Sequence, residues 1–122
     1  MFKEIQIGEK LVPMLANGAT PLRYKLVFRK DIITEFQLAE GDYSKVTNTI
    51  PELAYIMARQ ATASKGEADL QLLNFEQYLA WMEQFEPMDI ILASDAILDV
   101  YLGNNTPSLK PKKKVKDGVK ES

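Results

Sequence analysis

The chain has 122 residues, the length of one domain, and it contains neither cysteine nor histidine. This composition excludes disulfide bonds, thiol and imidazole catalysis and the commonest zinc ligands, so neither an enzyme nor a metal or cofactor protein is expected. Residues 1–109 hold nine basic and fifteen acidic side chains, a net charge of −6, and residues 110–122 hold six lysines and two acids, a net charge of +4. An acidic body argues against nucleic-acid binding. The absence of a signal peptide and of any long apolar run predicts an intracellular protein without membrane contact.

The first segment alternates apolar and polar residues, which predicts a β-hairpin about Gly8-Glu9-Lys10. Pro13 would confine the second strand to a sheet edge or a bulge. The apolar positions that carry the alternation are Phe2, Ile5, Ile7, Leu11 and Met14.

Beyond Asn17-Gly18 the apolar period changes from two to about 3.6, and a first helix is expected from Thr20, as N-cap, to about Leu38. Pro21 is acceptable in its first turn. Its stripe, spaced by four residues, consists of Tyr24, Phe28, Ile32 and Phe36. A turn is expected at Glu40-Gly41-Asp42.

Three further helices are predicted. The first covers about residues 51–63, with Tyr55 nearly opposite a core face of Leu53, Ile56, Met57 and Gln60. The next follows a cap at Asn74, with a stripe of Phe75, Tyr78, Leu79, Met82 and Phe85. The last begins at Pro87 and runs through Ile90, Ile91, Ile97, Leu98 and Tyr101 to a stop at Gly103. The expected fold is α+β and mainly helical: an N-terminal β-hairpin followed by about four helices in a domain of residues 1–103, with a disordered Lys-rich tail at 104–122.

Two features are candidates for a site. Asp95 and Asp99 lie four residues apart and could face one metal ion, but no further ligands are indicated, so a solvated face is the preferred interpretation. Trp81 lies about 90 degrees from the centre of its helix's apolar stripe. Either a broad apolar face covers it, or it is half exposed and forms a partner-binding patch together with Tyr55 and Met88.

Several motifs follow one another in a recognisable order. They are Ile7-Gly8-Glu9-Lys10, then Ala19-Thr20-Pro21-Leu22-Arg23-Tyr24 with Phe28 and Asp31, then residues 53–59 and 75–85. In this order the chain resembles the tail assembly chaperones of long-tailed phages and prophages of Gram-positive bacteria. The family often carries glycine after the phenylalanine that Phe28 matches. This chain has Arg29 there, so a helix that is broken in relatives is expected to run on.

The resemblance implies a chaperone of the host bacterial cytoplasm that binds the tape measure protein, keeps it soluble and promotes tail tube assembly around it. Such a protein is absent from the mature virion. The run Lys112-Lys113-Lys114 is compatible with a programmed frameshift whose longer product contacts the tail tube protein. Self-association into a homo-oligomer is left open. The alternative function is a small structural or adaptor protein of the phage tail or head–tail connector, and a nucleic-acid-binding regulator is not expected.

Overall fold

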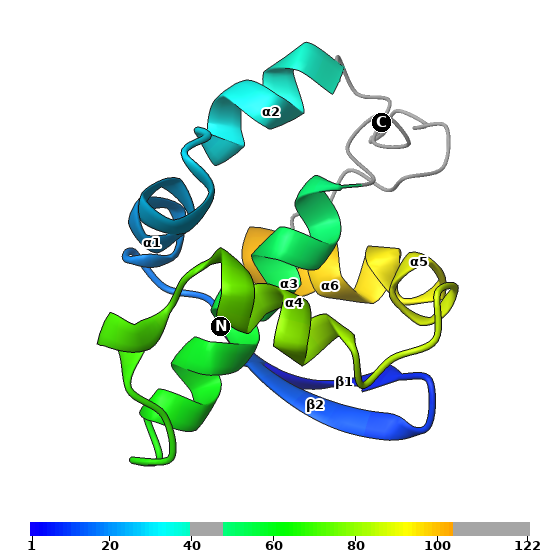
Figure 1. The fold of residues 1–122 in the computed structure, drawn as a ribbon. Coiled ribbons are helices and arrows are strands. Elements are labelled where there is room, and N and C mark those ends of the chain that lie inside the picture. Colours follow the sequence, from blue (N-terminus) through cyan, green and yellow to red (C-terminus); the bar gives the residue numbers. More distant parts are fainter. Residues whose placement is uncertain (40–47, 104–122) are drawn as a thin grey trace.

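The structure is a computed structural model, and it describes residues 1–39 and 48–103. An antiparallel hairpin of β1 (Phe2–Ile7) and β2 (Lys10–Leu15) is followed by α1 (Thr20–Phe28), α2 (Ile32–Ala39), α3 (Thr49–Ala63), the short 3₁₀ helix η2 (Leu70–Leu72), α4 (Phe75–Met82), α5 (Asp89–Leu92) and α6 (Ser94–Leu102). The expected mainly helical α+β fold with an N-terminal hairpin is confirmed (Figure 1). Within the described ranges, six α-helical segments replace the expected four or so. The predicted turn at 40–42 and the predicted tail at 104–122 lie outside the described residues.

The hairpin closes with a two-residue turn, because Ile7 pairs with Lys10 across Gly8-Glu9. One face is buried and supplies Ile5, Ile7, Val12 and Met14 to the core. The predicted alternation is confirmed at Ile5, Ile7 and Met14 and wrong at Phe2 and Leu11, which are 48% and 57% exposed, because Val12 and not Leu11 faces the core in β2. Gly8 has a φ of +61° and lies against the carboxylate of Asp89, so a Cβ at this position would collide with that side chain. The glycine therefore allows the turn to pack closely against the start of α5.

α3 forms the centre of the domain, and eleven of its fifteen residues are buried. It contacts β2, α1, α4 and α6, and Figure 1 shows the other elements arranged around it. The expectation that Tyr55 lies opposite the core is wrong, because α4 covers that side of the helix and leaves Tyr55 only 1% exposed. A helix that is enclosed on most sides has no solvent face on which a side chain could remain accessible.

Gln60 of α3 ties the hairpin to α1. Its Nε2 donates to the carbonyl oxygen of Leu15 at 2.7 Å and to Oγ1 of Thr20 at 2.8 Å, and its Oε1 accepts from Arg23 at 2.9 Å. Thr20 is fully buried, and its side chain does not cap α1, whose N-cap is Ala19. The predicted helix start is thus confirmed to within one residue. The predicted cap is wrong, because the Thr20 hydroxyl accepts a hydrogen bond from Gln60 of α3 and so connects α1 to α3.

The predicted continuous helix from Thr20 to Leu38 is wrong. α1 ends at Phe28, because Arg29 adopts the left-handed conformation (φ 61°, ψ 30°) and its N–H donates to the carbonyl of Lys25. Asp31 then accepts hydrogen bonds from the backbone N–H groups of Ile33 and Thr34, which starts α2. A helix stop and a helix start therefore lie side by side within three residues.

The last two predicted helices are partly confirmed. Asn74 caps α4 as expected, since its Oδ1 accepts from the N–H of Gln77 at 2.9 Å. The expected apolar stripe of this helix is wrong at Phe75 and Leu79, which are 51% and 42% exposed, while Tyr78 is buried. The predicted helix from Pro87 is divided into α5 and α6 at Ala93, and it ends as expected at Gly103, which has a φ of +63°.

Candidate partner-binding surface

The predicted patch of Tyr55, Trp81 and Met88 does not form a single surface. Tyr55 lies beneath α4, with ring centroids 5.5 Å from Tyr78 and 5.8 Å from Trp81. Trp81 is half-buried and packs edge-on against Phe85 at 5.0 Å. Tyr55 cannot contact another chain in this conformation, so its expected exposure is corrected, and it acts as the support on which Trp81 rests.

Trp81 borders an open hollow between β2, α3 and α4. The lining residues are Lys10, Leu11, Val12, Pro13, Ala58, Arg59, Thr62, Trp81 and Gln84. Met88 is 55% exposed but lies outside this lining. Binding of a partner through Trp81 or Met88 stays a prediction.

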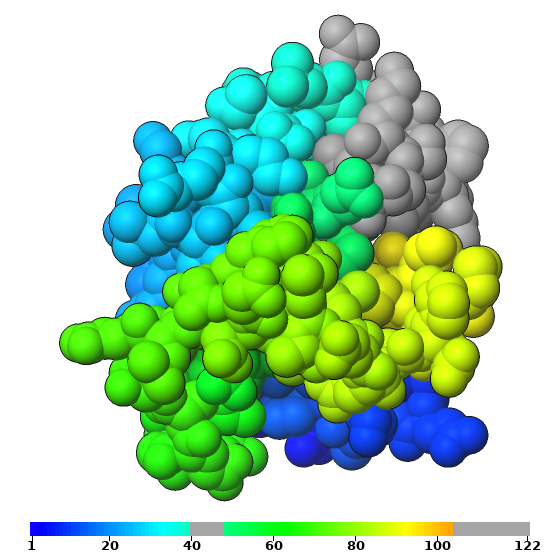
Figure 2. Space-filling view, viewed as in Figure 1, coloured from blue at the N-terminus to red at the C-terminus, as the bar shows by residue number. Residues whose placement is uncertain are grey.

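Sequence reasoning missed the exposed apolar face of α1 and α2. Leu22 and Leu26 of α1 are 65% and 75% exposed, and Ile33 and Leu38 of α2 are also exposed. A signal for α1 was present, because Leu22 and Leu26 are one turn apart and about 200 degrees from the Tyr24 and Phe28 positions on a helical wheel. In Figure 2 α1 and α2 lie at one edge of the molecule, away from α5.

Exposed apolar side chains also occur on α4 and at α5. They are Phe75 and Leu79 of α4 and Met88, Ile91 and Leu92 at α5. The sequence around them is acidic: residues 66–103 contain no lysine or arginine and eight acids, namely Glu67, Asp69, Glu76, Glu83, Glu86, Asp89, Asp95 and Asp99. Residues 20–30 are the opposite, with four basic side chains and no acid. The exposed leucines of α1 thus lie in a basic segment, whereas the exposed apolar side chains of α4 and α5 lie in an acidic one.

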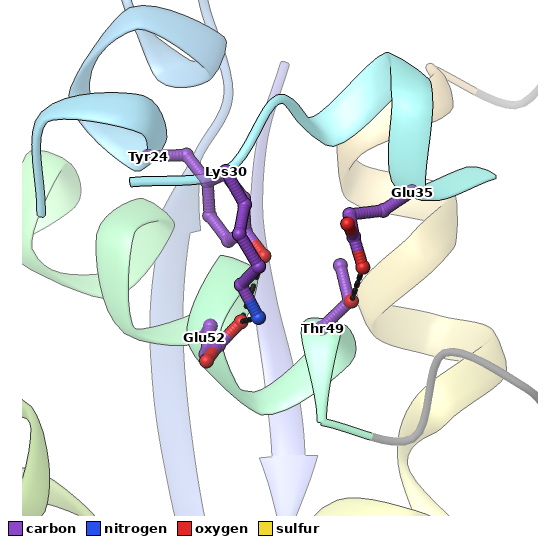
Figure 3. A network of polar contacts seen from close by, with 5 residues as sticks. All are labelled: Tyr24, Lys30, Glu35, Thr49 and Glu52. Carbon is purple, nitrogen blue, oxygen red and sulfur yellow. Dashed lines mark hydrogen bonds and ion pairs between the residues drawn. The ribbon is translucent and has the colours of Figure 1, made fainter. Parts of the chain in front are cut away.

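A buried polar network holds the end of α1 against α3 (Figure 3). The Tyr24 hydroxyl donates to Oε1 of Glu52 at 2.7 Å, and the Lys30 ammonium lies 2.9 Å from the same oxygen. Burial, followed by the bond to Glu52, raises the pKa of Tyr24 far above its ordinary value. Nearby, the Thr49 hydroxyl donates to Glu35 at 3.5 Å. Because the buried Glu52 charge already has both an ion-pair partner and a hydrogen-bond donor, we interpret the network as structural.

Metal binding and membrane insertion gain no support from the part of the chain that the structure describes. Within residues 1–39 and 48–103, no three acidic side chains are grouped so that they could hold a metal ion, Asp95 and Asp99 included. No helix in these ranges is long and apolar enough to cross a bilayer. A comparison of the chain with protein-family models, curated protein sequences and solved structures found no match.

Proposed function

We propose that this chain is a tail assembly chaperone of a long-tailed phage or prophage, which binds the tape measure protein and keeps it soluble while the tail tube assembles. The proposal rests mainly on the exposed apolar surface of the domain. Among the described residues, thirteen large hydrophobic side chains are at least 40% exposed, and most of them lie on helices. Monomeric proteins rarely leave such side chains clustered without a partner.

The break at Arg29 is a second, independent support. An arginine in the left-handed conformation occupies a backbone geometry that favours glycine, and glycine is what the chaperone family often carries at this position. The chain therefore keeps the backbone geometry for which the family's glycine is suited, even though the residue differs.

The proposed mechanism is physical. Apolar surface on the client is covered by the apolar faces of α1, α4 and α5, and many weak contacts along a long client add up to stable yet reversible binding. No catalysis, cofactor or nucleic acid is involved. Under this proposal the protein acts in the host cytoplasm, a longer frameshifted form contacts the tail tube protein, and neither form remains in the virion.

Co-expression tests the proposal. The soluble yield of the tape measure protein from the same genome is measured with the chain, without it, and with an unrelated acidic protein of similar size as the control. We expect the chain alone to raise the soluble yield. A tape measure protein that stays insoluble with the chain, or is soluble without it, would contradict the chaperone function.

Analysis of purified virions separates this function from the structural or adaptor alternative. A chaperone that leaves before assembly is complete is expected to be absent from the particles. Detection of the chain by mass spectrometry at a fixed ratio to the tail tube protein would instead assign it to the virion as a structural component.

A further inference from the structure

The exposed face of α1 has the spacing of a helix-docking surface. Leu22, Lys25 and Leu26 follow the pattern i, i+3, i+4, so they share one side of α1, and Arg29 follows directly after the helix end. The same four residues line an open hollow. Two leucines one turn apart, accompanied by two cations one turn apart, make a surface that is both apolar and positively charged.

A second hollow runs along the other side of Leu26. It is lined by Arg23, Leu26 and Val27 of α1 and by Leu70, Gln71 and Leu73 at η2. Leu26, 75% exposed, thus stands as a ridge between two hollows. Apolar side chains from one turn of a partner helix can enter the hollows on either side of this ridge.

The two cations of this face are unpaired within the part of the chain that the structure describes. Arg23 donates to Gln60 and Lys30 pairs with Glu52, so both are engaged within the domain. Lys25 and Arg29 have no ion pair with any of the described residues. Because residues 66–103 are uniformly acidic, an acidic partner is repelled from α4 to α6 and attracted to α1.

We propose that this face of α1 binds an amphipathic helix of another protein, one whose apolar stripe is flanked by Asp or Glu. The leucines and the two hollows receive the stripe, and Lys25 and Arg29 pair with the flanking carboxylates. The proposal rests on the proposed function in taking the client as the source of this helix. A second copy of the chain, offering its acidic α4, is the competing occupant.

Two designed peptides test the chemistry without the client. Each is about 18 residues, or five helical turns, with leucines at i, i+3, i+4 and i+7; one has Glu beside the stripe and the other Lys. Binding to the full chain is followed by fluorescence anisotropy of labelled peptide. We expect the Glu peptide to bind at least about tenfold more tightly than the Lys peptide, and added salt to reduce the difference. Equal binding of both peptides would overturn the proposal.

Matched variants locate the site. Leu26→Glu is expected to abolish binding of the Glu peptide, and the double variant Lys25→Glu/Arg29→Glu is expected to reverse the preference in favour of the Lys peptide. Phe2→Glu on β1 introduces the same side chain at a residue that is 48% exposed and has no part in the proposed binding surfaces, and it should leave binding unchanged. A Phe2→Glu loss as large as that of Leu26→Glu would overturn the assignment to α1. Circular dichroism checks that each variant is folded, which is expected of surface changes.

Two further measurements separate the possible failures. If Leu26→Glu keeps the tape measure protein as soluble as the wild-type chain does, the α1 site is wrong and the chaperone function stands. If the wild-type chain does not solubilise the client, the proposed function is wrong, and the peptide experiment still decides whether α1 binds acidic helices. Self-association in sedimentation velocity that Lys25→Glu/Arg29→Glu abolishes would assign the face to a second copy and overturn the proposal.

Discussion

At the scale of single residues, two core tyrosines with the same side chain differ in how their hydroxyls are satisfied. Tyr24 donates to Glu52 at 2.7 Å. The Tyr55 hydroxyl is buried and has no hydrogen-bond partner among the described residues. Burial raises the pKa of Tyr55. The Arg59 charge and the Asn74 backbone amide lower this pKa in part, but the amide is not in hydrogen-bonding geometry. The first hydroxyl therefore holds an element in place, whereas the second costs desolvation energy without a compensating bond.

Replacing each tyrosine with phenylalanine measures this difference. We expect Tyr24→Phe to reduce the free energy of unfolding by about 1.5–3 kcal/mol, because it removes a hydrogen bond to a buried carboxylate. Tyr55→Phe keeps the ring contacts and removes an unsatisfied polar atom, so it should be neutral or slightly stabilising. Urea denaturation followed by circular dichroism gives both values. Equal losses for the two variants would show that the Tyr55 hydroxyl has a partner after all.

At the scale of elements, the break between α1 and α2 depends on one strained residue. A left-handed conformation costs a non-glycine residue about 1–2 kcal/mol, and Arg29 is the only such residue at positive φ in the part of the chain that is described. We expect Arg29→Gly to raise the free energy of unfolding by about 0.5–1 kcal/mol. Lys25→Gly, inside α1 and also exposed, is the matched control and should lower it by about 1 kcal/mol. Destabilisation by both variants would mean that the Arg29 side chain contributes more than its backbone costs.

Local sequence signals predicted those elements whose boundaries depend on local chemistry. The hairpin turn was predicted about Gly8-Glu9-Lys10 and is formed by Gly8-Glu9. Like the turn, the Asn74 cap and the stop at Gly103 follow from backbone preferences of the residues present. The break at Arg29 could not be predicted in this way, because arginine has no preference for that conformation. The conformation persists because Asp31 starts α2 and Lys30 is drawn to Glu52.

Burial was harder to predict than helix position. Apolar spacing identified α4, but it assigned Phe75 and Leu79 to the core, and it assigned Tyr55 to the surface. In both cases the neighbouring element determines which side chains are buried. α4 is short and covers α3 with Tyr78 and Trp81, so Tyr55 is enclosed. The other side of α4, which carries Phe75 and Leu79, remains in solvent. The exposed leucines of α1 were overlooked for a related reason, since periodicity identifies an apolar side chain but not what covers it.

At the scale of the whole molecule, aromatic rings link the helices into one core. Phe28 of α1 contacts Tyr24 at 5.2 Å and Tyr78 of α4 at 5.0 Å, and Tyr55 of α3 connects this group to Trp81. Such pairs add roughly 0.5–1.5 kcal/mol each beyond the burial of their area. Because this core is rich in tyrosine, the stability of the domain depends on those hydroxyls remaining protonated.

The domain should therefore unfold at alkaline pH. Burial, reinforced by the Glu52 charge, raises the pKa of Tyr78 to about 12, whereas an unfolded tyrosine ionises near 10. Between these values the unfolded chain loses a proton that the folded chain keeps, so the stabilisation is fully present below about pH 10 and is lost as pH rises to about 12. At about 1.4 kcal/mol per pH unit, Tyr78 alone accounts for a loss of about 3 kcal/mol.

Denaturant titrations from neutral to alkaline pH, with tyrosinate absorbance as a second signal, measure this effect. The pKa values of Tyr24, Tyr55 and Tyr101 are also raised. The free energy of unfolding of the wild-type chain should therefore fall more steeply with pH above pH 10 than one tyrosine alone would cause. Tyr78→Phe removes one of these ionisations, so the free energy of unfolding should fall less steeply between pH 10 and 12. Tyr55→Phe should reduce the same pH dependence a second time. Stability that stays constant through this range, with tyrosinate forming near pH 10 in the folded protein, would show that the tyrosine hydroxyls are open to solvent and that the aromatic core is not closed.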